Sequence, residues 1–244
     1  MNFEMKILQD LISSLNTETD VLDIRQGVFH TGVLTRSCGL ASTLPRDALR
    51  QQPPLVKAPG RLLEKNAREL ADLAFSSSIL EAAIGMAAVN SLLDVDMAAC
   101  RELNARELIM AKGKGKRVAV VGHFPFVSAL KKTAKQLWVI EKNPHPDDFS
   151  EAETDRLLPH AQLVAITGSA FTTHTIMRLL GLCSPGAYIV VLGDTTPLST
   201  ILLDYGIDAV CGTVVSDHNQ ALRCISQGAN FRQIGGTRRL TMIK

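Results

Sequence analysis

Polar residues follow each of five short apolar runs in the second half of the chain, and their types could support binding or catalysis. The five runs are Val118–Val121, Leu137–Ile140, Leu163–Ile166, Tyr188–Leu192 and Ala209–Val215. If these runs are parallel strands, their carboxyl ends meet at one edge of a sheet, which is where such sheets bind ligands. The residues that we expect to contact a ligand there are Gly122, His123, Phe124, Pro125, Glu141, Asn143, Thr167, Gly168, Ser169, Gly193, Asp194 and Thr195.

Three side chains near this edge have the chemistry of metal ligands. His123 and Asp194 follow the first and fourth runs, and His174 comes a few residues after the third. Imidazole and carboxylate groups are suitable ligands for a divalent transition metal. The chain has no HxH or HxxxH pattern that would place two histidines on one ion. A metal held by His123, His174 and Asp194 therefore competes with the interpretation that these are ordinary loop residues.

The loop after the first run partly resembles a dinucleotide-binding turn. Gly122 permits a tight turn, and Pro125 suits the first turn of a helix whose free amides can face an anion. Glu141 lies about 20 residues later, where a ribose-binding acid would lie. The GxGxxG pattern is absent, however, because only Gly122 follows the run, and GxxxxGK[ST] is absent too. An NAD-type site is therefore disfavoured, while an adenosine ligand, another anion and a simple turn glycine remain open.

Nucleophilic catalysis receives little support from the sequence. A Ser-His-Asp set would need Ser169, Asp194 and either His174 or His218, and no GxSxG turn is present to expose the serine. The five cysteines contain no CxxC pair, which argues against a zinc ribbon or a redox pair. Reduced thiols are expected.

The five apolar runs alternate with segments of helical pattern, which sets the fold of the region that positions these loops. The helical segments are Phe126–Lys135, Glu151–Leu158, Thr173–Leu182, Leu198–Tyr205 and Asp217–Ser226. Continuous apolar strands separated by helices predict a parallel sheet that is buried on both faces. Right-handed crossovers then give an α/β fold with a doubly wound, Rossmann-like sheet. Arg238–Ile243 is expected to add a last strand.

The first hundred residues predict a smaller α+β unit. An amphipathic helix, three antiparallel strands and two further helices are expected at Glu4–Leu15, Asp20–Gly27, Phe29–Arg36, Gly39–Leu44, Leu62–Phe75 and Ile79–Leu93. Asn90 stands in the apolar half of the last helix, where it either hydrogen-bonds to backbone or points into a cleft. We therefore predict an α+β domain at residues 1–100 and a Rossmann-like domain at residues 101–244.

Composition narrows the classes of partner. The net charge of +2 gives no reason to expect nucleic-acid binding. No uncharged apolar run reaches the roughly 18 residues of a membrane span. The amino-terminal stretch carries four charges and no continuous apolar block, so no secretory signal is predicted and a cytoplasmic location is expected. The alanine-rich helix at Ile79–Leu93 could pack within one chain or across a homodimer.

Several longer motifs resemble one protein family. VVGHFPFV, IEKNPHPDD, LPHAQLVAITGSAF, VLGDTTPLS and YGIDAVCGTVV resemble the DUF364 family of heavy-metal chelation domain proteins. GLASTL and ILEAAIGMAAVNSLLD resemble the DUF4213 domain that precedes it. The resemblance implies an enolase-amino-terminal-like domain, a Rossmann-like domain and a site in the cleft between them. The positions that match the family are Gly122, Phe124, Pro125, Glu141, Asn143, Pro144, Thr167, Gly168 and Gly193.

The chain departs from the family pattern in two of the loops. Thr173-His174 stands where relatives have Asn-Gly, and GDTTP, which includes Asp194, stands where relatives read GPSTP.

From the resemblance and the polar strand-end residues, we expect a protein that binds a small ligand or a heavy-metal chelate in the interdomain cleft. The alternative is an enzyme acting on a nucleotide-like or metallo-cofactor substrate, with Glu141, His123 or His174 as acid or base. A structural scaffold with a vestigial cleft is a third hypothesis.

Overall fold

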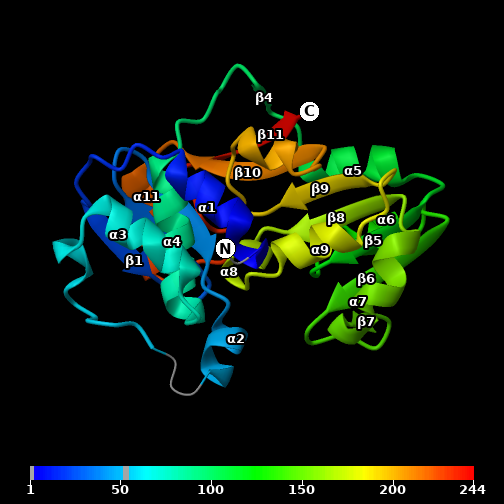
Figure 1. Ribbon diagram of the computed structural model, residues 1–244, viewed down its shortest axis with the longest axis horizontal. Helices are drawn as coiled ribbons and strands as arrows, with labels where there is room; N and C mark the ends of the chain where they lie inside the picture. The colour runs from blue at the N-terminus through cyan, green and yellow to red at the C-terminus, as the bar shows by residue number, and fades with distance from the viewer. Residues whose placement is uncertain (1–2, 52–54) are drawn as a thin grey trace.

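The computed structural model describes residues 3–51 and 55–244, which form a small α+β unit followed by a large α/β unit (Figure 1). The α/β fold class predicted from the sequence is confirmed.

The small unit is an antiparallel sheet covered by helices. Its elements are η1 (Phe3–Met5), α1 (Lys6–Ser13), β1 (Asp23–Gln26), β2 (His30–Leu34), β3 (Cys38–Ser42), α2 (Pro45–Arg50), η2 (Leu62–Glu64), α3 (Ala67–Asp72), η3 (Leu73–Phe75) and α4 (Ile79–Leu92). The strands pair in the order β1-β2-β3, as predicted. Helix α4 packs on β2 and β3. The absence of a side chain at Gly39 of β3 allows this contact, because a Cβ atom there would lie 2.1 Å from the carbonyl oxygen of Ala87 in α4.

The large unit is built on an eight-stranded sheet. Its elements are β4 (Cys100–Arg101), α5 (Ala105–Gly113), β5 (Arg117–Val121), α6 (Val127–Leu130), β6 (Gln136–Glu141), β7 (Phe149–Ser150), η4 (Glu151–Glu153), α7 (Thr154–Leu157), η5 (Leu158–His160), β8 (Leu163–Thr167), α8 (Ser169–Thr172), α9 (Ile176–Leu182), β9 (Tyr188–Leu192), α10 (Ile201–Asp204), β10 (Ala209–Val215), α11 (His218–Ser226) and β11 (Thr237–Ile243).

The strand order is β4-β11-β10-β9-β8-β5-β6-β7, and β5 to β10 run parallel. The chain winds outward from β5 in one direction through β6 and β7. It then returns to β8 and winds outward in the other direction. Strands β5 and β8 are neighbours, and the loops that follow them lead in opposite directions along the sheet. This divergence leaves room for a ligand between the two loops.

The predicted helices of the large unit are shorter in the structure than in the sequence pattern. The segment Phe126–Lys135 contains only the single turn α6, because its last residues turn back to pair with the start of β5 through Lys135 N–H and Lys116 O. The segment Thr173–Leu182 begins late, because His174 has a backbone φ of 58°, which no α-helix accepts. Strands β4 and β7 have two residues each and were not predicted, since a pair of residues has no period.

The two units share one core. Helix α1 packs against α10, and its Asp10 carboxylate accepts a hydrogen bond from the Tyr205 hydroxyl. In the other direction α11 leaves the large sheet and lies on β1 and β2, beside the small unit in Figure 1. A Cβ atom on Gly27 would lie 2.2 Å from the carbonyl oxygen of Ile225, so the sequence leaves no side chain in the way of this helix.

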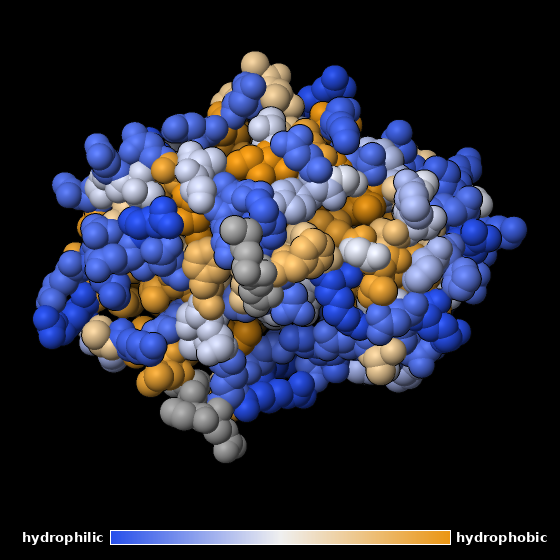
Figure 2. Space-filling view, in the orientation of Figure 1, coloured by the Kyte–Doolittle hydropathy of each residue, from blue (hydrophilic) through white to orange (hydrophobic). Residues whose placement is uncertain are grey.

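Among the residues that the structure describes, no helix is long and apolar enough to cross a membrane. Figure 2 shows hydrophilic side chains over most of one face, with apolar side chains gathered near its centre.

Candidate functional site

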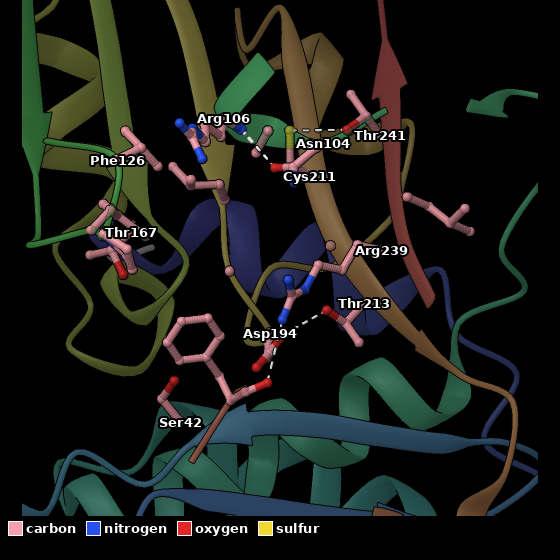
Figure 3. A pocket seen from close by; sticks show the side chains of 18 of the residues that line it. Ser42, Asn104, Arg106, Phe126, Thr167, Asp194, Cys211, Thr213, Arg239 and Thr241 are labelled. Carbon is pink, nitrogen blue, oxygen red and sulfur yellow. Dashed lines mark hydrogen bonds between the residues drawn. The ribbon is translucent and has the colours of Figure 1, made fainter. Parts of the chain in front are cut away.

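A cavity of about 440 Å³ lies at the carboxyl ends of β5, β8, β9 and β10, where the small unit covers the large sheet. The small unit contributes His30 and Ser42, and the large unit contributes His123–Phe126, Thr167, Gly193, Asp194, Thr213 and Arg239. Arg106 and Arg232 also line this space, so we call it the arginine cavity. Figure 3 labels Arg106 and Arg239 in it. It lies at the sheet edge that the apolar runs predict.

A second cavity of about 280 Å³ adjoins the first at the ends of β5, β6 and β8. The two cavities share Ser42, His123, Phe124 and Thr167. Asp47, Glu141 and Glu151 line the second space against the single cation Lys142, so we call it the acidic cavity. The cleft thus has two compartments of opposite charge.

Asp194 is the most enclosed charged group of the arginine cavity. Its Oδ2 lies 3.0 Å from Nε2 of His30, and its Oδ1 accepts a hydrogen bond of 2.6 Å from the Thr213 hydroxyl. Burial opposes ionisation of this carboxyl, but the hydrogen bonds and charges of its neighbours outweigh burial and lower its pKa below the ordinary value. The contributing neighbours are His30, Thr213 and Arg239, and Figure 3 shows the Arg239 side chain extending from β11 toward Asp194.

The loop that carries Asp194 is fastened to the small unit by hydrogen bonds. The Asn90 amide donates to the carbonyl oxygen of Leu40 at 2.8 Å and to that of Thr195 at 3.2 Å. The backbone N–H of Ser42 donates to the Thr195 hydroxyl at 2.9 Å. Of the two interpretations of Asn90, the backbone hydrogen bond is confirmed. Because the two hydrogen bonds to Thr195 cross between the units, they fix the position of Asp194 relative to His30.

Three arginines give the first compartment a positive character. The guanidinium groups of Arg232 and Arg239 each lie 5.5 Å from the ring centre of Phe231. Among the described residues no carboxylate lies within 4.0 Å of Arg106, Arg232 or Arg239. One Arg239 Nη donates to the Phe231 carbonyl oxygen at 3.4 Å, and the guanidinium groups of all three arginines keep donors that can bind a carboxylate or phosphate group.

Aromatic rings supply flat apolar surface in the same space. The rings of Phe124 and Phe126 lie 5.3 Å apart at an angle of 10°. Both rings line the arginine cavity, and Phe124 also borders the acidic one. Aromatic faces of this kind stack on planar ligands.

Hydrogen-bond acceptors dominate the acidic cavity. Glu141 ends β6 and accepts a hydrogen bond of 3.2 Å from the backbone N–H of Lys142, whose side chain lies 3.4 Å from Asp47 of the small unit. Gly122 has φ of +104° at the turn after β5, which a residue with a side chain rarely adopts. This compartment suits the hydroxyl groups or the cationic part of a ligand.

A third feature lies on the rim of the cleft, where two histidines and an aspartate come together. His123 Nδ1 lies 3.2 Å from Asp148 Oδ2, and the rings of His123 and His145 lie 4.9 Å apart. One ligand atom from each of these three residues lies within 4.8 Å of the others. In the part of the chain that the structure describes, this is the one such group of three or more His, Cys, Asp or Glu side chains.

The predicted metal set is not brought together. His123 has Asp148 as its partner, whereas Asp194 is held by His30. His174 Nε2 lies 2.7 Å from the carbonyl oxygen of Ala74 in η3, because the left-handed backbone at His174 turns its ring toward the small unit. His174 fastens the two units rather than joining His123 or Asp194 in the group of metal-ligand atoms described above.

Most of the predicted ligand residues do line the cleft. The residues that border one or both cavities are Gly122, His123, Phe124, Pro125, Glu141, Asn143, Thr167, Ser169, Gly193 and Asp194. Gly168 and Thr195 are buried and border neither of the two cavities. His218 is exposed as the first residue of α11, which follows β10 and lies beyond the edge of the sheet.

The sequence did not single out the residues that come from other elements. His30 lies in a strand of the small unit. Arg106 lies on α5, Arg232 lies before β11 and Arg239 lies on β11. Their distances along the sequence from the strand ends form no pattern that would have linked them to the cleft. His145 and Asp148 stand in IEKNPHPDD, a stretch with a visible concentration of histidine and aspartate.

The two buried thiols, Cys38 and Cys211, are not poised for metal or nucleophilic chemistry. All five cysteines are free. Burial raises the pKa of Cys38 to about 12 and that of Cys211, which borders the arginine cavity, to about 11. Since the thiolate is the metal ligand and nucleophile, these protonated thiols are inert near neutral pH.

Comparison with known families agrees with this two-unit architecture. Residues 104–244 match DUF364 and residues 8–93 match DUF4213, each described as "Putative heavy-metal chelation". The chain belongs to the DUF364 family. The resemblance seen in the sequence motifs is therefore confirmed.

Three similar proteins show how far the similarity extends. An uncharacterised protein of Methanocaldococcus jannaschii is 28% identical over 167 residues, which span 66% of this chain and 64% of that protein. A DUF364 protein of unknown function from Desulfitobacterium hafniense has a TM-score of 0.83 at 24% identity, over 99% of this chain and 98% of that one. One from Pyrococcus horikoshii has a TM-score of 0.84 at 22% identity, over 99% and 100%. The two structures show that the fold is shared.

Proposed function

We propose that this protein binds an anionic small molecule, free or as a metal chelate, in the cleft between its two units. The observation that carries the proposal is the arginine cavity, where three guanidinium groups without a carboxylate partner among the described residues line the same space as one carboxylate, Asp194. An excess of positive charge in a partly enclosed space raises the local concentration of anions and strengthens their binding. The heavy-metal chelation description of both domains supports a metal-bearing form of the ligand.

The size and shape of the space indicate the class of molecule. A cavity of about 440 Å³ falls within the usual range for small-molecule sites. The parallel rings of Phe124 and Phe126 favour a planar group, and the arginines favour carboxylates or phosphates on it. Asp194 does not repel such a ligand strongly, because His30 and Thr213 already bind its two oxygens.

Binding of anilinonaphthalene sulfonate, a planar aromatic anion, tests the proposal directly. We expect saturable fluorescence enhancement in the wild-type protein. Arg106→Gln and Arg239→Gln should each weaken binding roughly tenfold, because a hydrogen bond to a charged group contributes about 1.5–3 kcal/mol. Arg101→Gln is the matched control, since Arg101 is exposed on neighbouring β4 and borders neither cavity. Equal binding in all four proteins would show that the arginines do not form an anion site.

A second candidate is an enzyme that acts on a nucleotide-like or metallo-cofactor substrate. This candidate is favoured by the adjoining acidic cavity, where Glu141 ends β6 and His123 borders both compartments. A ribose could bind through its hydroxyls to Glu141 while its phosphates reach the arginines. Thermal unfolding in the presence of NAD, S-adenosylmethionine and ATP tests this candidate, and the absence of stabilisation by all three would rule it out.

A further inference from the structure

We infer that His123, His145 and Asp148 form a binding site for one divalent transition-metal ion on the rim of the cleft. One ligand atom from each side chain already lies within 4.8 Å of the others. A zinc ion with bonds of about 2 Å draws its ligand atoms closer than this. Both imidazoles are exposed, and His123 Nδ1 already lies 3.2 Å from Asp148 Oδ2, so rotation of the exposed rings is enough to bring the three ligand atoms onto one ion.

The loop between β6 and β7 prepares the carboxylate of this site. Pro144 and Pro146 flank His145 and restrict the backbone on both sides of it. Asp148 N–H donates to the His145 carbonyl oxygen at 2.9 Å, and the His145 N–H donates to Asp148 Oδ2 at 3.1 Å. The Asp148 side chain is only 5% exposed. Because the turn is closed before any ion arrives, binding requires little further ordering of the chain.

The donor atoms select the class of metal. Two imidazoles and one carboxylate suit Zn²⁺, Co²⁺ or Ni²⁺, whereas Ca²⁺ and Mg²⁺ prefer sites made of oxygen ligands. The group contains no cysteine, so it lacks the thiolate that soft heavy metals favour. Three protein ligands leave at least one coordination position for water or another molecule.

The position of the site connects it to the cleft. His123 borders both the arginine and the acidic cavity, while His145 and Asp148 border neither. An ion at this rim therefore lies next to the point where the two compartments meet. The inference does not require the proposed anion site, because the ion alone is sufficient to test it.

Isothermal titration of chelator-treated protein with zinc chloride tests this inference. We expect one Zn²⁺ per chain in the wild type. His145→Ala and Asp148→Asn should weaken the affinity at least about 100-fold, because each removes a direct ligand. Asp147→Asn and His160→Ala are matched controls that should bind like the wild type, since both residues are exposed and outside the group.

Cobalt(II) absorption provides a second measurement on the same proteins. The wild type and both controls should show a visible d–d spectrum at one equivalent of Co²⁺ per chain. Loss of this spectrum in His145→Ala and Asp148→Asn supports the site. Asp148→Asn keeps the size of the side chain and an oxygen that accepts the loop hydrogen bond, so circular dichroism should show an intact fold. Failure of the wild type to bind Zn²⁺, or equal affinity in all variants, would overturn the inference.

Discussion

At the scale of a single residue, Asp194 links the two units through its contact with His30. Its carboxylate belongs to the large unit, and its imidazole partner His30 belongs to β2 of the small unit. Both side chains are almost fully buried. A charge in such a place is stable only while its partners remain, so the pair makes the closed cleft the favoured arrangement of the two units.

We predict that Asp194→Asn destabilises the protein more at neutral pH than in acid. The pKa of Asp194 is lowered in the folded state, so its contribution to stability is present above the unfolded value of about 4 and is lost as pH falls through the folded pKa. Loss of the buried pair should reduce the free energy of unfolding by about 3 kcal/mol at pH 7. Urea unfolding of both proteins at pH 7 and pH 3 measures this difference.

The exposed residue Asp147 provides the control for this experiment, and Asp147→Asn should change stability little at either pH. A deficit for Asp194→Asn that is equally large at pH 3 would show that the hydrogen-bond geometry, and not the charge, stabilises the folded state.

At the scale of elements, α4 and β3 hold the small unit's side of the cleft. Gly39 lets the backbone of β3 approach α4, and Asn90 of α4 then reaches the carbonyl oxygens of Leu40 and Thr195. The same contact therefore packs the small unit and positions the loop of Asp194.

Gly39→Ala should be strongly destabilising. Its Cβ atom would lie 2.1 Å from the Ala87 carbonyl oxygen and 2.2 Å from the Ser91 nitrogen, and both are backbone atoms that cannot rotate away. We expect a loss of about 3 kcal/mol in the free energy of unfolding, at the upper end for overpacking, measured by urea denaturation. Gly181→Ala on α9 has open space around its Cβ and should be neutral or slightly stabilising. Similar stability of the two variants would contradict the close contact of α4 with β3.

The elements also show what the sequence could predict. The strands β5, β6, β8, β9 and β10 were predicted because each is a continuous apolar run, and burial on both faces imposes such a run locally. The helix lengths were less accurate, since tertiary hydrogen bonds end α6 and a left-handed residue delays α9. The strand-end residues of the cleft were predictable from topology. His30 and the arginines were not, because only the folded chain brings them to that edge.

At the scale of the whole molecule, the boundary near residue 100 separates two sequence patterns but not two cores. Helix α1 packs on α10 of the large unit, and α11 packs on β1 and β2 of the small one. A single cluster of buried side chains includes Leu11 and Val89 as well as Val164 and Met242. Each unit therefore has apolar surface that only the other unit covers.

This exchange of helices predicts that the two units unfold together. Separation of the units would expose the apolar face of α1 and the side of β1 and β2 under α11, and water would have to cover both. Scanning calorimetry should therefore give one transition whose van't Hoff enthalpy equals the calorimetric enthalpy. Tyr205→Phe, which removes the hydrogen bond to Asp10, should lower the midpoint of that single transition without splitting it. Two resolved transitions would mean that the units are independently stable.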